Sequence, residues 1–385
     1  MLAGFGVLFY AIHVAQVWAH PRNPSDFIGF RSWAALLRAA PRATAIYDFA
    51  QVDRFIQAAI PGYPHHYPFA YPPSLLLLIW PLGYLSWRIG ALAWMAAGIA
   101  SYTLLLAEAP WRRQIAIGVL LVPVTALSVA VGQDGLIVAG LLAGGCRFLP
   151  RRPVLAGVLF GLAACKPQFG VLVPVALIAA RQWRTIAAAV ATVLATVAAS
   201  GLAFGWQLWI RWPQALIALS RFAGENRRLY PMMPTVSGNL RVIGAAPELI
   251  WAAQALAALA TAIVVWRVWR RRGPGRAASA VLLVGAFLAT PYGFFYDLPI
   301  LNAGLLAFGL ERIARGARLA WWEWAIVALV VALPIAMDAA GLGFALPRWL
   351  PLSLPVLVAA FAMVAWRALD TGGAGGQGAR PSPTP

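Results

Sequence analysis

Short clusters of arginine interrupt the chain and divide it into a long series of apolar runs. The clusters are Arg112-Arg113, Arg147 with Arg151-Arg152, Arg181 with Arg184, Arg267 with Arg270-Arg271-Arg272 and Arg276, and Arg312 with Arg315 and Arg318. In membrane proteins the cytoplasmic loops collect Lys and Arg. The pattern therefore predicts a chain that crosses a membrane many times, with these clusters inside and the segments between them outside.

The composition excludes the other broad classes of protein. Hydrophobic residues make up 62% of the chain, charged residues make up 11%, and the mean hydropathy is +0.75. A soluble domain is roughly half apolar and about a quarter charged, so neither a soluble domain nor a disordered chain fits. Two cysteines, both in apolar runs, exclude a disulfide scaffold. The net charge of +18 follows from the topology and predicts no nucleic-acid partner, because no basic stripe carries interleaved aromatic residues.

The apolar runs predict an all-α polytopic fold of about 10 to 12 transmembrane helices, with both chain ends inside and a single membrane domain over residues 1–367. Residues 1–18 form the first span, an anchor without a cleavage signal. Residues 19–72 form a first outer loop with short helices over 31–40 and 49–59, and residues 205–247 form a second outer loop. The Gly-, Pro- and Ser-rich residues 368–385 predict a disordered cytoplasmic tail.

Residues 72–109 contain two short apolar runs broken at Ser86-Trp87-Arg88. The loop before them is outside and Arg112-Arg113 is inside, so this stretch must cross the membrane an odd number of times. Pro72-Pro73 and Pro81 predict a kinked or re-entrant segment followed by one full span. Irregular backbone at membrane depth needs protein or water around it, which indicates a cavity near the outer face.

Lys166 is the only lysine in the chain, and it lies between two apolar half-spans, in front of Pro167. An ammonium group at membrane depth is costly and marks a functional site by default. Its compact charge suits a phosphate group. A lysine that merely reaches for the interface would accept arginine, which the chain uses everywhere else. The sequence therefore favours a ligand-binding role.

Two aspartates of the first outer loop are candidates for proton transfer or substrate binding. Asp26 follows the first span in Asn23-Pro-Ser-Asp-Phe, where a carboxylate would act as a general base on an incoming hydroxyl. On spacing alone, a helix N-cap or an Asx turn is the favoured interpretation of Asp26. Asp48 has the same two interpretations.

Other polar and aromatic residues gather on the predicted outer face. The stretch from Tyr63 to Pro73 contains His66 and Tyr71 among aromatics and prolines, which fits an interfacial belt or a platform for sugar rings. Gln133, in the break Gly132-Gln-Asp-Gly135, would bind a sugar hydroxyl or cap a helix. Arg241 is one of several outer-loop arginines that run against the positive-inside trend and would suit a phosphate. No metal-binding motif is present, because His65-His66 lacks a third ligand.

Several motifs, taken in order, resemble glycosyltransferase family 87 of the GT-C superfamily over residues 20–305. They are Asp26-Phe after the first span, Tyr47-Asp48, Phe69-Ala-Tyr71-Pro-Pro-Ser, Gly132-Gln133, the run from Arg152 through Lys166-Pro167, and Thr290-Pro-Tyr292. The resemblance implies a GT-C-like bundle that takes a hexose, usually mannose and often in an α-1,2 linkage, from a polyprenyl-phosphate donor, with inversion. The acceptor would be a lipid or a glycan, and the site would face the outside of the inner membrane.

The resemblance also distributes roles over the candidates. Asp26 takes the place of the family's catalytic aspartate, and Lys166 takes the place of the family lysine, which contacts the donor phosphate. The chemistry adds Arg241 as a second candidate, because a departing phosphate needs cations around it. Asp48, Tyr71, Gln133 and His66 are left to bind the sugar or the acceptor. Membrane lipids are the remaining partners, no cofactor is predicted, and dependence on a divalent metal stays open. The alternative is a transporter or flippase of lipid-linked sugars, for which we find no internal repeat.

Overall fold

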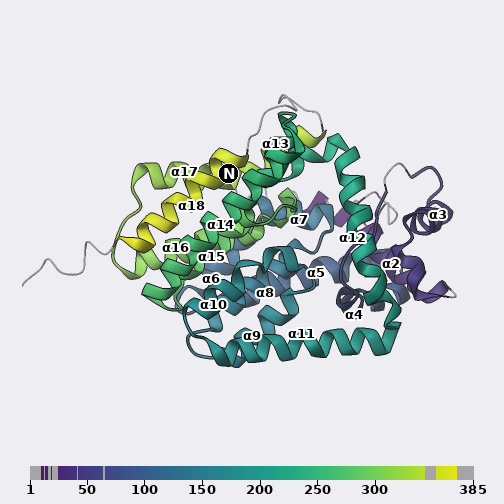
Figure 1. Ribbon diagram of the computed structural model, residues 1–385, viewed down its shortest axis with the longest axis horizontal. Helices are drawn as coiled ribbons and strands as arrows, with labels where there is room; N and C mark the ends of the chain where they lie inside the picture. The colour runs from purple at the N-terminus through teal and green to yellow at the C-terminus, as the bar shows by residue number, and fades with distance from the viewer. Residues whose placement is uncertain are drawn as a thin grey trace, which may run out of the picture.

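The computed structural model describes residues 25–370 apart from 41, 64–65 and 343–352, together with positions 10–12, 14–15 and 19. The predicted first span and the predicted tail therefore lie mostly outside the described residues. The described residues are mostly helical and include no strand. The all-α fold predicted from the sequence is confirmed, and Figure 1 shows the helices stacked as a bundle.

The segment predicted as the first outer loop forms α2 (Phe27–Ala39), the 3-10 helix η1 (Ala43–Tyr47) and α3 (Phe49–Ala59). The second helix of the loop begins and ends as predicted, whereas the first begins four residues earlier than the predicted start at residue 31. One face of α2 is buried because it packs on the segment that follows the loop. Arg31 and Arg38 of α2 donate hydrogen bonds to the carbonyls of Leu85 and Gly83.

The broken segment over 72–109 has the predicted form. Three short pieces, η2 (Pro73–Leu75), α4 (Leu76–Ile79) and η3 (Trp80–Tyr84), precede the full-length α5 (Trp87–Leu106). Prolines near the starts of η2 and η3 lack an N–H group and interrupt regular helix. Ser86 then caps α5 by accepting a hydrogen bond from the Ile89 amide.

Four described helices are long and apolar enough to cross a membrane: α5, α11 (Trp183–Phe204), α14 (Pro247–Arg272) and α17 (Trp321–Leu342). A fifth candidate is the pair α6 (Arg112–Leu121) and α7 (Pro123–Val131), which bends by 59°. Pro123 explains the bend because its ring cannot continue the hydrogen-bond ladder of α6. At most 39% of the apolar window of any of the four long helices is buried, which leaves wide faces for lipid.

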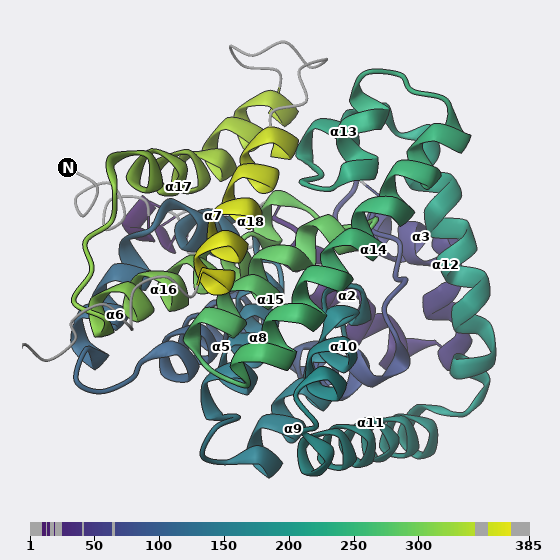
Figure 2. The ribbon, with the colours of Figure 1, turned by 60° about the vertical axis from the view of Figure 1, so that its left-hand side comes forward.

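Shorter helices fill the middle of the bundle. They are α8 (Gly135–Phe148), α9 (Pro153–Ala163), α10 (Leu172–Ala179), α15 (Arg276–Ala289), α16 (Pro299–Ala314) and α18 (Ser353–Leu369). Nearly every residue of α8 and α15 is buried, so these two form the core. Helix α11 lies along α9 at one edge, as both views show (Figures 1 and 2). Many predicted spans thus exist as apolar helices too short to cross a bilayer by themselves.

The second outer loop joins the first on one side of the molecule. It contains α12 (Gln207–Glu225), η5 (Arg227–Met232) and α13 (Val236–Val242). Helix α12 runs beside α2 and α3 in both views (Figures 1 and 2). The indole of Trp212 on α12 donates a hydrogen bond to the Ala70 carbonyl, 3.0 Å away, and so fastens the two loops together.

Residues predicted on the inner side meet at helix ends away from these loops. Arg276 forms an ion pair of 2.9 Å with Glu108, and Arg367 forms one of 2.7 Å with Glu323. Arg147 donates to the Leu105 carbonyl, and Arg272 donates to the carbonyl of Ala368. The arginine-rich loops are therefore joined by direct contacts, as expected if they share one face of the membrane.

Candidate active site

The turn Gly132-Gln133-Asp134-Gly135 connects α7 to α8 and is the point at which two distant loops meet. Gly132 has a left-handed φ of 75°, and a Cβ there would lie 2.9 Å from the Phe27 amide nitrogen. A Cβ on Gly135 would collide with the carbonyl oxygen of Tyr296. The two glycines thus allow the start of α2 and the loop before α16 to approach opposite ends of one turn.

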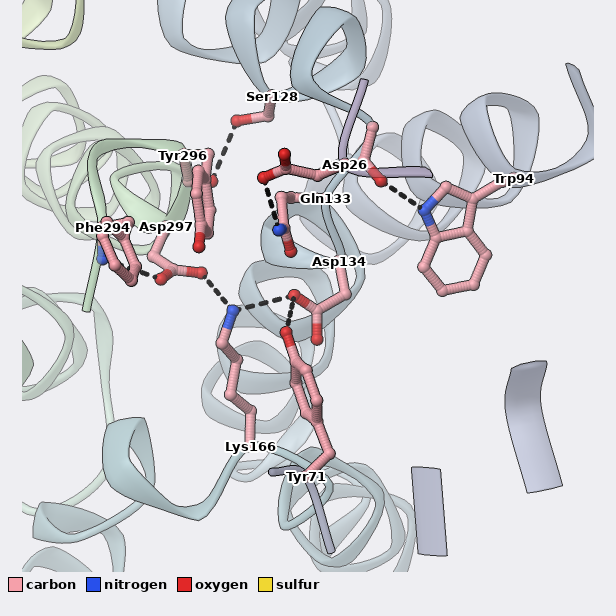
Figure 3. Close-up of polar contacts among 11 residues, drawn as sticks. Asp26, Tyr71, Trp94, Ser128, Gln133, Asp134, Lys166, Phe294, Tyr296 and Asp297 are labelled. Carbon is pink, nitrogen blue, oxygen red and sulfur yellow. Dashed lines mark hydrogen bonds and ion pairs between the residues drawn. The ribbon is translucent and has the colours of Figure 1, made fainter. Parts of the chain in front are cut away.

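Asp26 immediately precedes α2, yet its carboxylate makes no capping hydrogen bond to that helix. Its Oδ1 accepts a hydrogen bond of 2.9 Å from the Tyr67 hydroxyl, and its Oδ2 accepts one of 2.7 Å from the Gln133 side-chain amide. Its backbone N–H donates to the Val131 carbonyl, 2.7 Å away. The carboxylate is only partly buried and is held from two sides beside the turn, as Figure 3 shows for the Gln133 contact.

Tyr67 belongs to the aromatic stretch and is the donor to Asp26 Oδ1. Its hydroxyl also lies 2.9 Å from the Tyr63 hydroxyl, and its carbonyl accepts from the indole of Trp33 at 2.9 Å. Burial, followed by the nearby Asp26 carboxylate, raises the pKa of Tyr67 well above its ordinary value. The hydroxyl therefore stays protonated and remains a hydrogen-bond donor to Asp26 at every physiological pH.

Lys166 lies in the irregular backbone between α9 and α10, where Pro167 opens the short 3-10 helix η4 (Pro167–Phe169). Its Nζ donates hydrogen bonds of 2.8 Å to Asp134 Oδ1 and 2.7 Å to Asp297 Oδ1. The lysine is 4% exposed, Asp134 1% and Asp297 0%. Asp297 ends η6 (Phe295–Asp297), and its Oδ2 accepts from the Phe294 amide at 3.1 Å. The three charges form a buried ion triad, shown in Figure 3, with one carboxylate in excess.

Aromatic rings and unpaired polar atoms surround the triad. The Lys166 Nζ lies 5.8 Å from the Tyr71 ring centroid and 5.4 Å from that of Tyr296, within reach of a cation–π attraction. The Tyr71 hydroxyl is 3.4 Å from Asp134 Oδ1. Gln133 Oε1 and Asp134 Oδ2 are buried without a hydrogen-bond partner among the described residues. Buried polar atoms of this kind suit a bound ligand or water.

Four of the predicted site residues therefore come together: Asp26, Tyr71, Gln133 and Lys166. Asp26 precedes α2, and Tyr71 lies in the aromatic stretch. Gln133 belongs to the α7–α8 turn, and Lys166 belongs to the α9–α10 turn. The lysine, however, already has two carboxylate partners, which a purely phosphate-binding role does not anticipate.

The other three predicted residues make their contacts elsewhere. Asp48 is an exposed N-cap of α3 and accepts hydrogen bonds from Gln51, as its structural interpretation anticipated. His66 is 2.6 Å from Asp53 in a small pocket closed by Phe222 of α12. Arg241 lies over the rings of Tyr230 and Trp251, at 5.7 and 5.9 Å from their centroids.

Asp297, Asp134 and Tyr67 complete the cluster, and sequence reasoning gave none of them a role. A signal for the two aspartates was present, because a lone lysine in an apolar context requires a counter-charge, and both aspartates lie at predicted outer ends of spans. Tyr67 carried no comparable signal among its aromatic neighbours. In the described part of the chain, no group of three or more His, Cys, Asp or Glu could hold a metal ion.

Helices that are long and apolar enough to cross a membrane, together with a buried polar cluster at the turns between shorter helices, define a polytopic membrane protein. The model of glycosyltransferase family 87 matches residues 69–291, a region that contains the turn, Tyr71 and Lys166. The chain therefore belongs to glycosyltransferase family 87, and it is a multi-pass membrane glycosyltransferase. No curated protein and no solved structure matches the chain.

Proposed function

We propose that the protein transfers a hexose, with mannose as the first candidate, from a polyprenyl-phosphate donor to a hydroxyl of a lipid or glycan acceptor. The reaction takes place at the outer face of the inner membrane and inverts the anomeric carbon. The observation that carries this proposal is the state of Asp26: a partly exposed carboxylate, held by Tyr67 and Gln133, beside the buried triad.

Asp26 acts as the general base in this proposal. It removes the proton from the acceptor hydroxyl as the oxygen attacks the anomeric carbon. The two hydrogen bonds fix the direction of the carboxylate, because each of its oxygens has its own donor. Its partial exposure leaves room for an acceptor, whereas a fully buried carboxylate would be unreachable.

The state of the other carboxylates supports inversion. A retaining mechanism with a covalent intermediate needs a second accessible carboxylate as nucleophile. Asp134 and Asp297 are buried, and both form ion pairs with Lys166. A single displacement, in which the acceptor oxygen enters as the phosphate leaves from the opposite side, therefore fits this cluster better.

The departing group is a lipid phosphate, which leaves without a strong acid, so the site has to stabilise negative charge. The Lys166 ammonium carries three N–H donors, and its described hydrogen bonds to Asp134 and Asp297 use two of them. We assign the third donor to a phosphate oxygen of the donor. Arg241 stays a second candidate for this contact, and Tyr71 and Gln133 stay candidates for the sugar hydroxyls.

The direct test uses purified protein in nanodiscs with a panel of polyprenyl-phosphate sugars and a mixture of lipid acceptors. We expect transfer from the mannose donor, with the anomeric configuration of the product inverted when it is read by NMR. Movement of a fluorescent lipid-linked sugar across the bilayer without any transferred product would contradict the proposal and favour a flippase. A product with retained configuration would contradict the single displacement.

A further inference from the structure

An apolar groove of about 320 Å³ lies between α6, α7 and α16, outside the cluster described above. Ile115, Gly118 and Val119 of α6 and Leu306 of α16 form its walls, and Thr125 and Asn302 lie among them. The lining includes no Asp, Glu, Lys, Arg or His among the described residues. Apart from its polar end at Thr125 and Asn302, such a groove suits a hydrocarbon chain.

One end of the groove lies close to the candidate active site. Thr125 stands one helical turn before Ser128 on α7, and the Ser128 hydroxyl donates to the Tyr296 carbonyl at 3.0 Å. On the other wall, the backbone N–H of Asn302 donates to the carbonyl of Leu298, which precedes Pro299 and follows Asp297 in the chain. The groove therefore begins about 5 Å, one turn of helix, from the loop that carries Asp297.

From this end the groove follows α16 toward the arginine-rich ends of the helices. Asn302 and Ile313 both line it, and the helix between them is about 16 Å long at 1.5 Å per residue. A lipid whose headgroup reacts at the outer face has its hydrocarbon chain pointing toward the middle of the bilayer, which is the direction of this groove. The bend of 59° between α6 and α7 lies beside the groove.

Unpaired polar atoms mark the end nearest the site. The hydroxyl of Thr125 and both polar atoms of the Asn302 side chain are buried and have no hydrogen-bond partner among the described residues. A buried polar group without a partner costs about 1–3 kcal/mol, so these atoms suit a ligand that is polar only at this end. A phosphate joined to a hydrocarbon chain has this character.

We infer that the groove binds the polyprenyl chain of the donor, with its phosphate end beside Thr125 and Asn302. This inference rests on the proposed function, since it names the place of the donor within the same reaction. The chain runs between α6 and α16 toward the inner leaflet, so that the phosphate faces Lys166 and the sugar faces Asp26.

Two glycines provide a matched pair of variants. A Cβ added at Gly118, in the groove, would meet no atom within 4 Å, and the same holds at Gly309 on α16, outside the groove. Gly118→Phe therefore places a ring in the groove with open space at its Cβ, and Gly309→Phe adds the same ring elsewhere. Gly118 on α6 and Thr125 on α7 are seven residues apart, about 10 Å along the two helix axes that meet at the bend. A short geranyl chain therefore ends near Gly118, and a long chain must pass it.

Binding is measured first, with no sugar present. Dissociation constants of undecaprenyl phosphate and geranyl phosphate are compared for wild type, Gly118→Phe and Gly309→Phe in nanodiscs. We expect Gly118→Phe to weaken undecaprenyl phosphate about tenfold, the loss expected when a few methylene groups leave an apolar groove, and to leave geranyl phosphate nearly unchanged. Gly309→Phe should match wild type with both ligands.

The outcomes separate the two proposals. Equal affinity of all three proteins for undecaprenyl phosphate would overturn the inference and leave the groove to ordinary bilayer lipid. An equal loss for both ligands in Gly118→Phe would also overturn it, because chain length would not matter. Transfer assays with undecaprenyl-phosphate mannose follow. If wild-type protein binds the chain but transfers no mannose, the proposed function is contradicted, whereas the assignment of the groove to the polyprenyl chain still holds.

Discussion

Two aspartates of the first outer loop begin from the same interpretation and end in different environments. Both stand immediately before a helix, which is the usual place of an N-cap. Asp48 caps α3, whereas Asp26 turns away from α2 and accepts hydrogen bonds from Tyr67 and Gln133. A carboxylate that stands before a helix start but makes no capping hydrogen bond to that helix indicates a chemical role by its direction.

Replacing Asp26 by asparagine tests that role with little change of shape. Asp26→Asn keeps an acceptor for Tyr67 but removes the base, and we expect transfer to slow about a hundred- to ten-thousandfold. Asp48→Asn, the matched control, should keep most of its activity because asparagine caps helices about as well as aspartate. Initial rates and thermal unfolding of both variants check this. An active Asp26→Asn beside an inactive Asp48→Asn would show that the wrong carboxylate has been chosen.

The buried triad predicts that Lys166 matters for stability as well as for the donor. Lys166→Ala would leave two buried carboxylates without a counter-charge, and loss of one partner of such a pair costs about 3–5 kcal/mol. A triple variant, Lys166→Met with Asp134→Asn and Asp297→Asn, removes the charges together and should regain most of the loss. Unfolding in detergent measures both. Equal free energies of unfolding for Lys166→Ala and wild type would rule out the ion pairs. A triple variant that folds stably but does not bind the donor would support the phosphate contact.

At the scale of elements, the α7–α8 turn holds the site together because two glycines let neighbouring loops approach. We expect Gly135→Ala to destabilise the protein by about 1–3 kcal/mol, since a Cβ there collides with the Tyr296 carbonyl and must displace the loop of Asp297. Gly309→Ala is the control, because its Cβ enters open space and alanine favours a helix interior. Thermal unfolding and initial rates compare them. Identical behaviour of the two variants would contradict the close packing of this turn.

The positions of the helices could largely be predicted from the sequence, whereas the contacts between separate helices could not. Apolar runs between arginine clusters predicted the positions of α8, α9, α15 and α16 to within a few residues, because lipid solvation requires long apolar stretches. Lys166 and Gln133 stood out as polar residues in apolar surroundings. The pairing of Lys166 with Asp297 could not be predicted, since it depends on how separate helices pack and no local pattern records it.

At the scale of the whole molecule, all the arginine-rich loops should lie on one side of the membrane. Arg54 on α3 and Arg271 at the end of α14 are both exposed, and they form a matched pair for labelling. In a background with Cys146 and Cys165 replaced by serine, Arg54→Cys should react with an impermeant thiol reagent from the periplasmic side, and Arg271→Cys only after permeabilisation. Reversed labelling would invert the topology and move the proposed reaction to the cytoplasmic face.

The span of sequence that the ion triad brings together has a consequence for biosynthesis. Asp134 and Lys166 are 32 residues apart and can pair soon after both leave the ribosome, whereas Asp297 follows Lys166 by 131 residues. Until α15 and the loop before α16 have been made, the nascent chain holds only a lysine and one of its two aspartates. The core of the candidate site is thus completed late in translation, and a chain truncated before residue 297 would lack one of the two carboxylate partners of Lys166.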